Sequence, residues 1–482
     1  MVKKNIILNV VGFILIMEGF FMLLGIPFSL YFDDNDIGIL LVSGLGTSLI
    51  GLLLFLITKN KDDDIRKREG YIIVSISWIV MSAFGAIPFV LHGSIPSYTD
   101  AFFETMSGFT TTGASILNDI ESLPHGLLFW RSITQWLGGM GMIVLSLAIL
   151  PILGIGGMQL FVAEVPGPTK DKLHPRVRET AMRLWGIYVL FTLLETLLLI
   201  IGGMTFFDAI CHSFTTMATG GFSTKQSSIA FYQSPFIHYV IIVFMFIAGT
   251  NFALLYHVLH GKIGNLKDND EFKFYTFIVL FWTIVISATL YFANYGGVEI
   301  SFRDSLFQVV SIITTTGFVT ADYEVWGTFL LLIFFLLLFS GSCAGSTGGS
   351  IKVVRHYLLL KNSLLELRRL IHPRAIIPVR FNKHSVSQDI VSNILAFFLF
   401  YMFIFILGSI IMSLLGMDFL SAIGSVATSL GNVGPAIGSV GPTDNFANVP
   451  TIGKWVLSFL MLMGRLELFT ILVIFSPAFW KS

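Results

Sequence analysis

Long apolar segments alternate with short polar segments along the whole chain. Two apolar helices are predicted first, at about 5–27 and 37–58, and a basic loop follows them. From about Gly70 a pattern then repeats: a long apolar helix, a short semi-apolar segment, a polar turn and a second long apolar helix. Because about 20 apolar residues in a helix cross a hydrocarbon core of about 30 Å, the pattern predicts an all-α polytopic membrane protein.

The repeated pattern also predicts the domain organisation. Residues 1–69 hold the two N-terminal transmembrane helices and a cytoplasmic loop. Four pore repeats follow, at 70–179, 180–271, 272–387 and 388–482. The expected fold therefore has four membrane–pore-loop–membrane repeats around a pseudo-fourfold pore, with about ten spanning helices plus four half-helices.

The polar turns are the most specific feature of the repeats. They read "TTTGAS" from Thr110, "ATGGFST" from Ala218, "TTTGFVTAD" from Thr314 and "GNVGPAIG" from Gly431. Aligned on the last glycine of each turn, the preceding segments carry Asp100, Asp208, Asp304 and Ser421 at one shared position. Aspartate or serine before a helical run predicts an N-cap, and so a half-helix of about eight residues before each turn. A helix of that length re-enters a membrane without crossing it.

Basic residues predict the orientation of the chain. Lysine and arginine gather in the segments 59–69, 170–183, 262–273 and 352–383, whereas the loops that carry the half-helices hold few. The positive-inside rule makes the basic segments cytoplasmic, together with both termini. All four turns then enter from the outside, and repeats of one orientation are related by an axis along the membrane normal.

Composition agrees with a membrane protein and narrows the function. The chain is 55% hydrophobic and 12% charged, with a mean hydropathy of +0.82. The two cysteines and ten histidines show no metal-ligand spacing, and no GxxxxGK[ST] motif for ATP is present. An intramembrane enzyme would need paired aspartates, a histidine cluster or a Ser–His pair at membrane depth, and we find none of these in the sequence. We therefore expect neither an enzyme nor an organic cofactor.

The turns are suited to holding a cation. Irregular backbone at membrane depth is tolerated where it is buried or lines a water-filled cavity. A ring of such turns presents carbonyl oxygens that replace the hydration shell of an ion. Glycine permits the unusual dihedral angles, and threonine adds hydroxyl oxygens. The half-helices direct their partly negative C-terminal ends toward the path, which favours a cation.

Two further features predict a gate. The segment Ser340–Ser350, "SGSCAGSTGGS", consists of small residues and interrupts the second helix of the third repeat. Small residues also permit close helix packing, but the poor helix propensity of this run favours a broken helix. Arg465 lies about ten residues from either end of the last apolar helix, where an arginine costs about 2.5–3.5 kcal/mol and usually serves function. We also expect Glu104, in the first half-helix, to hydrogen-bond to the backbone near the first turn.

The chain resembles the Trk/Ktr/HKT superfamily of cation transporters, and most closely its TrkH-type bacterial potassium-uptake subunits. The resemblance covers nearly the whole chain, and the two helices before the first repeat favour the TrkH branch over KtrB. Besides the turns, it rests on three stretches: "FWRSITQWLGGMGMIVL" from Phe129, "SGSCAGSTGGSIKVVRH" from Ser340 and "GRLELFTILVIFSPAFW" from Gly464.

The resemblance implies a set of functional residues. The selectivity filter for K⁺ would be Thr111, Thr112, Gly113, Thr219, Gly220, Gly221, Thr315, Thr316, Gly317, Asn432, Val433 and Gly434. The gate would comprise the 340–350 loop, with Gly345, Gly348 and Gly349, together with Lys352 and Arg465. The fourth turn departs most from the pattern, because Asn-Val replaces Thr-Thr. In the plant branch a serine at the first filter glycine accompanies sodium transport, so Gly113 favours potassium.

The resemblance also implies the setting of the protein. It predicts a homodimer in the bacterial inner membrane, surrounded by lipid, with a cytosolic nucleotide-binding regulatory subunit of the TrkA type and no nucleic acid. Two alternatives within transport stay open at this point. One is the potassium-binding subunit of an ATP-driven pump, and the other is a sodium-permeable or ion-coupled transporter of the same superfamily.

Overall fold

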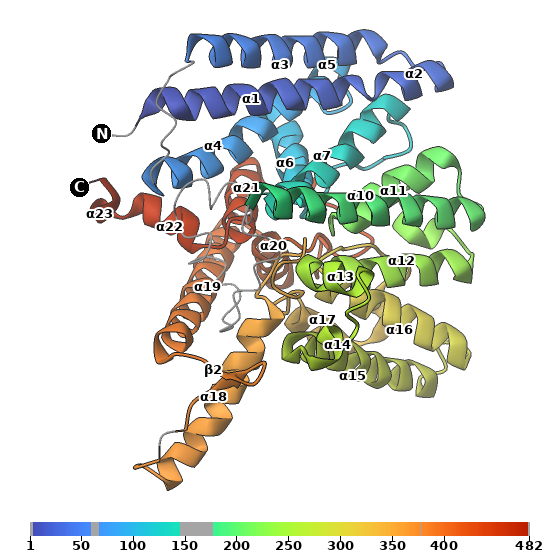
Figure 1. Ribbon diagram of the computed structural model, residues 1–482. Helices are drawn as coiled ribbons and strands as arrows, with labels where there is room; N and C mark the ends of the chain where they lie inside the picture. Colours follow the sequence, from blue (N-terminus) through green and yellow to red (C-terminus); the bar gives the residue numbers. More distant parts are fainter. Residues whose placement is uncertain (1–2, 59–66, 145–176, 376, 481–482) are drawn as a thin grey trace.

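The computed structural model describes residues 3–58, 67–144, 177–375 and 377–480, and it is mainly helical (Figure 1). Within these ranges, six helices are long and apolar enough to cross a membrane, or eight if each of two bent helix pairs forms one span. Two of the basic segments from which the orientation was predicted are described only in part: residues 59–66 of the segment 59–69 and residues 170–176 of the segment 170–183 lie outside the described residues.

The N-terminal layer consists of two long antiparallel helices that lie side by side (Figure 1). Helix α1 spans Lys4–Leu23 and continues through α2, Ile26–Phe32, and α3 spans Ile37–Ile57. Their backbones approach closely at small residues: a Cβ atom added to Gly12 would lie 2.7 Å from the carbonyl oxygen of Gly51. This close contact is typical of helix pairs in membranes.

The first two repeats follow the predicted order of elements. In the first, α4 and α5 precede the half-helix α6 and the second helix α7; in the second, α10 precedes the half-helix α11, and α12 and α13 follow it. Their bounds are α4 Lys67–Gly85, α5 Ile87–His92, α6 Tyr98–Phe109, α7 His125–Val144, α10 Val177–Ile201, α11 Phe206–Met217, η2 Ser228–Phe231, α12 Pro235–Ala248 and α13 Phe252–Leu259.

The last two repeats have the same order. Their half-helices are α16 and α20, and a short antiparallel hairpin, β1–β2, follows the projecting helix α18. The bounds are α14 Gly264–Asp268, α15 Asp270–Phe292, α16 Val298–Ile313, η3 Tyr323–Trp326, α17 Thr328–Leu337, α18 Val353–Ile371, β1 Arg380–Phe381, β2 His384–Ser385, α19 Gln388–Leu414, α20 Phe419–Gly431, α21 Thr451–Arg465, α22 Phe469–Phe475 and α23 Pro477–Trp480.

The half-helices begin earlier than predicted, and the predicted caps are wrong. In α6 the N-cap is Ser97, whose hydroxyl accepts a bond from the backbone N–H of Asp100. The caps of the other three are Thr205, Gly297 and Asp418. The half-helices therefore contain 12, 12, 16 and 13 residues, and the aspartates lie inside the helix. An aspartate in the first turn stabilises a helix through the helix dipole. In the sequence, such an aspartate is therefore hard to distinguish from one that caps the helix.

The second helices of three repeats are broken. The α12–α13 pair bends by 107° at residues 249–251, and the α21–α22 pair bends by 115° at residues 466–468. In the third repeat, 15 residues separate Leu337, the end of α17, from Val353, the start of α18. That break confirms the interruption predicted at Ser340–Ser350, whereas the other two breaks were not predicted.

Candidate functional site

The four polar turns share one backbone conformation, although their sequences differ. The second residue of each turn has a positive φ between 51° and 57°, and the glycine two residues later has a positive φ between 77° and 103°. These second residues are Thr111, Thr219, Thr315 and Asn432, and the glycines are Gly113, Gly221, Gly317 and Gly434. The alignment of the turns on their last glycine therefore corresponds to a structural equivalence.

Backbone hydrogen bonds fix each turn to the end of its half-helix. In the first turn the N–H of Thr112 donates to the carbonyl of Ser107 at 2.8 Å. In each of the other turns the residue before the glycine at positive φ also donates its N–H to the carbonyl five residues earlier, at 2.8–3.0 Å. These bonds satisfy carbonyl groups that a helix C-terminus leaves without partners. The threonines that precede this glycine in the first three turns, and Asn432 and Val433 of the fourth, are buried, so a rigid, irregular backbone forms inside the protein.

The turns form a closed ring in chain order. A Cβ atom added to Gly113 would lie 2.2 Å from the carbonyl oxygen of Gly220 in the second turn. Each of the other three ring glycines likewise approaches a carbonyl of the next turn, that of the residue just before the next ring glycine. These distances are 2.0 Å from Gly221 to Thr316, 2.1 Å from Gly317 to Val433 and 2.8 Å from Gly434 to Thr112. Only a residue without a side chain fits such a contact.

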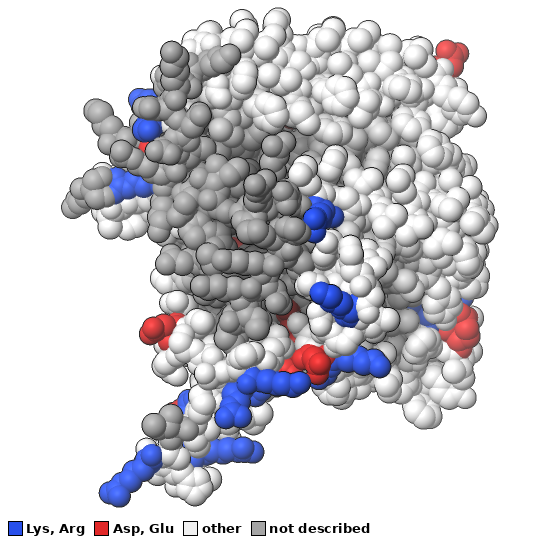
Figure 2. Space-filling model, in the orientation of Figure 1, with Lys and Arg blue, Asp and Glu red and all other residues white. Residues whose placement is uncertain are grey.

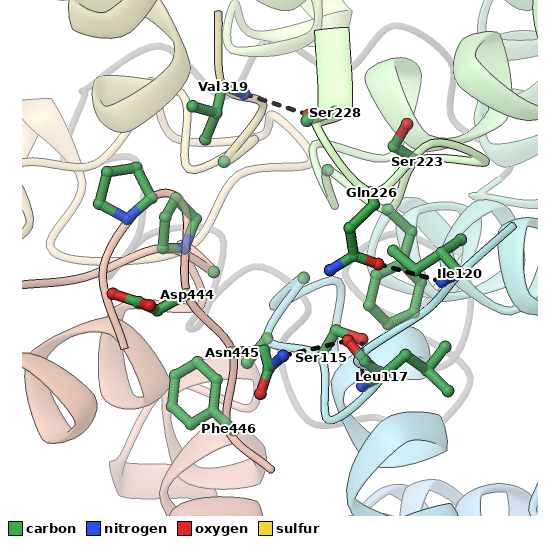
Figure 3. Close-up of a pocket in the computed structure, with 18 of the residues that line it drawn as sticks. Ser115, Leu117, Ile120, Ser223, Gln226, Ser228, Val319, Asp444, Asn445 and Phe446 are labelled. Atoms are coloured by element: carbon green, nitrogen blue, oxygen red, sulfur yellow. Dashed lines mark hydrogen bonds between the residues drawn. The ribbon is translucent and has the colours of Figure 1, made fainter. Parts of the chain in front are cut away.

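One pocket opens on this ring (Figure 3). Its lining includes all four ring glycines and the segments that follow each turn, with Ser115, Ser223 and Val319 among them. Hydrogen bonds join these segments across repeats: Gln226 accepts from Ile120 N at 3.0 Å, and Asn445 donates to Leu117 O at 3.2 Å. The pocket is a vestibule shaped by the segments that leave the ring, which run back beside the half-helices, as the bonds of Ser115 and Ile116 to Glu104 of α6 show.

The ring is suited to a desolvated cation. Four half-helices end immediately before the turns, so four partly negative helix C-termini adjoin one small volume. Carbonyl and threonine hydroxyl oxygens are hard ligands of the kind that bind alkali cations in filters. Within the described residues, no group of three or more His, Cys, Asp or Glu side chains could hold a metal ion.

The fourth turn keeps the conformation of the others with different side chains. Asn432 has a φ of 52°, a value that asparagine adopts more readily than threonine. Its Nδ2 donates to Thr112 Oγ1 and to the carbonyl of Met461, both at 2.9 Å. The residue that departs from the pattern therefore joins the fourth turn to the first.

The small-residue loop lies at the end of the ring where the half-helices terminate. Thr347 Oγ1 donates to the carbonyl of Met217 at 3.0 Å, at the end of the second half-helix. Gly349 N donates to Thr315 Oγ1 at 2.7 Å, and a Cβ atom on Gly349 would lie 2.5 Å from the carbonyl oxygen of Gly431. The loop therefore contacts three of the four repeats opposite the vestibule.

The residues predicted to form a gate are gathered in this loop. Lys352 Nζ donates to the carbonyl of Gly348 at 2.5 Å. Gly345 has a φ of 73° and its carbonyl accepts from Phe252 N at 3.1 Å, beside the bend between α12 and α13. Lys352 thus bonds to the loop that it follows.

Arg465 is buried, and its place in the helix differs from the prediction. It is the last residue of α21, at the bend that leads to α22, rather than the middle of a continuous helix. Its Nη1 donates to the carbonyl of Thr347 at 2.7 Å, and its Nη2 to the carbonyl of Gly138 in α7 at 3.0 Å. The guanidinium group therefore ties the loop to the first repeat.

Several residues around the site were not singled out from the sequence. Glu271 accepts from Ala344 N at 2.6 Å, and Asn251 donates to the carbonyl of Ala344 at 2.7 Å, so both anchor the loop. Gln135 donates to the carbonyl of Gly220 at 2.7 Å, and Arg131 pairs with Glu104 at 2.7 Å. Arg131 and Gln135 lie four residues apart on α7, a polar face that helical periodicity would have indicated.

The fold and the ring define a class: a channel-like membrane transporter with four half-helix repeats around one path. The family model described as "TrkH: Cation transport protein" matches residues 43–482. The chain belongs to this TrkH family of cation transport proteins. Membership in a transport family also argues against the intramembrane enzyme considered above.

Individual relatives agree with the family. The chain is 43% identical to the Trk system potassium uptake protein TrkH of Escherichia coli strain K12 over 438 residues, which is 90% of each chain. It is 42% identical to the TrkH of Salmonella typhimurium over 437 residues, again 90% of each. The crystal structure of the potassium transporter TrkH from Vibrio parahaemolyticus matches with a TM-score of 0.91 at 35% identity, covering 99% of this chain and 100% of that one. The predicted resemblance and fold class are confirmed.

Proposed function

We propose that this chain is the ion-translocating subunit of a Trk-type system and carries potassium into the cell. The closed ring of turns is the observation that supports this function best, because fixed carbonyl oxygens can replace water around a dehydrated cation. Relatives that share about nine-tenths of the chain are named Trk system potassium uptake proteins, which favours this reading over the subunit of an ATP-driven pump.

We assign the selectivity filter to the three residues at the core of each turn. The path for K⁺ then runs from the vestibule through the ring. The filter residues are Thr111, Thr112, Gly113, Thr219, Gly220, Gly221, Thr315, Thr316, Gly317, Asn432, Val433 and Gly434. One of these carbonyls, that of Gly220, also accepts from Gln135, and its second lone pair remains for an ion.

We assign the gate to the 340–350 loop below the ring. Gly345, Gly348 and Gly349 allow its turns, and Lys352 and Arg465 hold it by their bonds to its carbonyls. Two positive charges beside the path also oppose the passage of a cation. Flux then requires the loop and the arginine to move together, since they are bonded to each other.

We place the protein in the bacterial inner membrane, with both termini in the cytoplasm. Both termini lie on the same side of the molecule (Figure 1). Lysine and arginine side chains gather at the end where α18 and the hairpin project (Figure 2). By the positive-inside rule this end faces the cytoplasm. It is the face on which we expect a nucleotide-binding TrkA-type partner, and we expect two copies of the chain to form a dimer within the lipid.

Growth on limiting potassium tests this function. The chain is expressed in bacteria that lack their own potassium uptake systems but retain a Trk-type regulatory subunit, and growth and Rb⁺ uptake are measured. We expect the chain to restore both. We expect Gly221→Ala to abolish the rescue, because its Cβ would lie 2.0 Å from a ring carbonyl.

Gly203→Ala is the matched control for this experiment. Gly203 also has a positive φ, of 100°, but nothing lies within 4 Å of an added Cβ. A chain that reaches the membrane and still fails to restore growth would refute the proposed function. Equal rescue by Gly221→Ala and Gly203→Ala would show that the ring is not part of the ion path.

A further inference from the structure

The half-helices carry a polar residue nine positions before each ring glycine. These residues are Glu104, His212, Gln308 and Ser425. All four are buried in the protein, although three of them are long or ionisable side chains. A buried polar group is costly unless it is hydrogen-bonded, so the partners of these side chains indicate what they do.

In the first repeat the partner is the segment that leaves the ring. Glu104 Oε2 accepts from the backbone N–H of Ile116 at 2.9 Å, and Oε1 accepts from the Ser115 hydroxyl at 3.0 Å. Ser115 and Ile116 follow Gly113 by two and three residues. The carboxylate thus spans the distance from the half-helix to the outgoing chain, across the outside of the turn.

The second and third repeats use different side chains for the same connection. His212 Nδ1 donates to the carbonyl of Asp208 at 2.7 Å, and its Nε2 meets the Ser223 hydroxyl, two residues after the ring glycine, at 2.9 Å. Gln308 Nε2 donates to the carbonyl of Ala321 at 3.1 Å, four residues after its ring glycine, and lies 3.4 Å from Thr320 Oγ1. Three unlike residues therefore fasten three outgoing segments.

The fourth repeat lacks this connection among the described residues. The hydroxyl of Ser425 donates to the carbonyl of Ala422, within its own half-helix, at 3.2 Å. Serine is too short to reach the outgoing segment. The Thr428 hydroxyl instead donates to the carbonyl of Gly434, directly at the ring, at 2.9 Å.

A second set of bonds extends the first connection to the neighbouring repeat. Arg131 Nε pairs with Glu104 at 2.7 Å, and its Nη1 donates to the carbonyl of Ser223 at 2.9 Å. Its guanidinium carbon lies 3.6 Å from the centre of the Phe222 ring. One helical turn along, Gln135 accepts from Phe222 N at 3.0 Å and donates to the Gly220 carbonyl. Helix α7 therefore fixes the second turn relative to the first.

We infer that Glu104, His212 and Gln308, with Arg131 and Gln135, are positioning residues that set the width of the ring and thereby its preference for K⁺ over Na⁺. This inference rests on the proposed function of the ring as the filter. The outgoing segment begins at the ring glycine, whose contact with the next turn determines how far apart the turns lie. A fastened segment resists the contraction that a smaller cation would require, whereas a released segment allows it.

The least disruptive test removes a neutral hydrogen bond. Gln308→Met keeps the length of the side chain and loses its donor, and Ser223→Ala removes the hydroxyl that meets His212. Ser425→Ala is the matched control at the equivalent position of the fourth repeat. Each variant is expressed as the full chain in the potassium-uptake-deficient cells, and K⁺ and Na⁺ uptake are measured at equal membrane levels.

We expect Gln308→Met and Ser223→Ala each to lower the K⁺-to-Na⁺ uptake ratio by about fivefold, the equivalent of one neutral hydrogen bond. We expect Ser425→Ala to keep the wild-type ratio. The ratio is the informative quantity, because a general loss of stability would lower the uptake of both ions together.

Two results would overturn the inference. The first is an unchanged ratio in both Gln308→Met and Ser223→Ala with normal K⁺ uptake. The second is an equal change in Ser425→Ala. If Gln308→Met does not accumulate in the membrane, the comparison of Ser223→Ala with Ser425→Ala decides alone whether the inference holds. A wild-type chain that carries no potassium is a different failure, because it refutes the proposed function itself and the inference with it.

Discussion

At the scale of single residues, the ring depends on backbone conformations that its own side chains disfavour. Thr111, Thr219 and Thr315 are β-branched residues at positive φ, a state that costs of the order of 1–3 kcal/mol for each residue. The strain persists because the half-helix bonds and the neighbouring turn fix each residue. Asn432 adopts the same state at less cost, so the fourth turn departs in sequence but fits in conformation.

The first ring glycine gives a prediction at this scale. We expect Gly113→Ser to lower the K⁺-to-Na⁺ uptake ratio by about tenfold or more, because its Cβ would displace the Gly220 carbonyl that it would approach to 2.2 Å. Separate uptake measurements for each cation, in cells without other potassium systems, check this result.

Gly93→Ser is the control for Gly113→Ser. Gly93 has a φ of 79°, close to the 84° of Gly113, but an added Cβ meets nothing within 4 Å. The two variants therefore share the backbone strain and differ in the contact. An unchanged selectivity in Gly113→Ser would argue that Gly113 is no part of the filter.

At the scale of elements, the breaks in the second helices bring the gate together. Asn251 caps α13 through its side-chain oxygen and binds Ala344 of the loop, so one bend meets the loop directly. At the other bend, Glu467 forms an ion pair with Arg355 of α18 at 2.5 Å. The bends of the second and fourth repeats and the helix that follows the loop are thus connected by side chains.

Arg465 gives a prediction at the scale of elements. Arg465→Ala removes two bonds that hold the loop and one positive charge beside the path. We expect potassium flux to rise by about tenfold or more, since charge-assisted bonds contribute about 1.5–3 kcal/mol each. Rb⁺ flux into vesicles that contain the purified chain would measure the change.

Two further variants distinguish the effect of the positive charge on flux from the effect of the bonds that hold the loop. We expect Thr347→Val, which removes the hydroxyl bond to the Met217 carbonyl and leaves the charge in place, to raise flux less than Arg465→Ala does. We expect Arg465→Lys to lie between wild type and Arg465→Ala. A normal or reduced flux in correctly inserted Arg465→Ala would exclude the arginine as a barrier.

The elements also show which features the sequence could predict. The break at Ser340–Ser350 was predictable, because eleven small residues have little tendency to form a helix. The bends at 249–251 and 466–468 were not predicted: Gly-Thr-Asn and Leu-Glu-Leu are short interruptions, and the apolar runs on both sides read as one continuous span. These bends depend on distant contacts, such as that between Asn251 and Ala344. The four turns followed from internal repetition, and the family resemblance assigned the twelve proposed filter residues within them. Helical periodicity could indicate the shared face of Arg131 and Gln135, but it does not reveal that they act on another repeat.

At the scale of the whole molecule, the charge distribution separates two ends. The vestibule lies at one side of the ring, and the loop, Lys352 and the basic helix α18 lie at the other. A cation that enters from the vestibule meets Lys352 and Arg465 only after it has passed the ring. This arrangement suits a transporter that a cytoplasmic partner opens, because the partner can reach the side where the obstruction lies.

The assembly gives a prediction at this scale. We expect the tagged chain, purified in mild detergent, to have a protein mass of two copies of the 53.5 kDa chain and to bring with it a soluble nucleotide-binding regulatory subunit. Light scattering gives the mass, and protein sequencing identifies what co-purifies.

Charge reversal on α18 provides the control for partner binding. Arg368→Glu with Arg369→Glu changes the exposed end of this helix, far from the ring, and we expect the dimer to persist while the partner is lost. A P-type ATPase in place of the soluble subunit would favour the pump alternative. A single-copy mass across the detergents tested would contradict the dimer.

The contact between Asn432 and Thr112 joins residues 320 positions apart, and the ring is complete only when it forms. A ribosome that has made three repeats has therefore inserted an open arc rather than a pore. The last turn to leave the ribosome is also the one that closes the ring on the first. We therefore expect a chain cut after the third repeat to carry no potassium, because its arc of turns stays open.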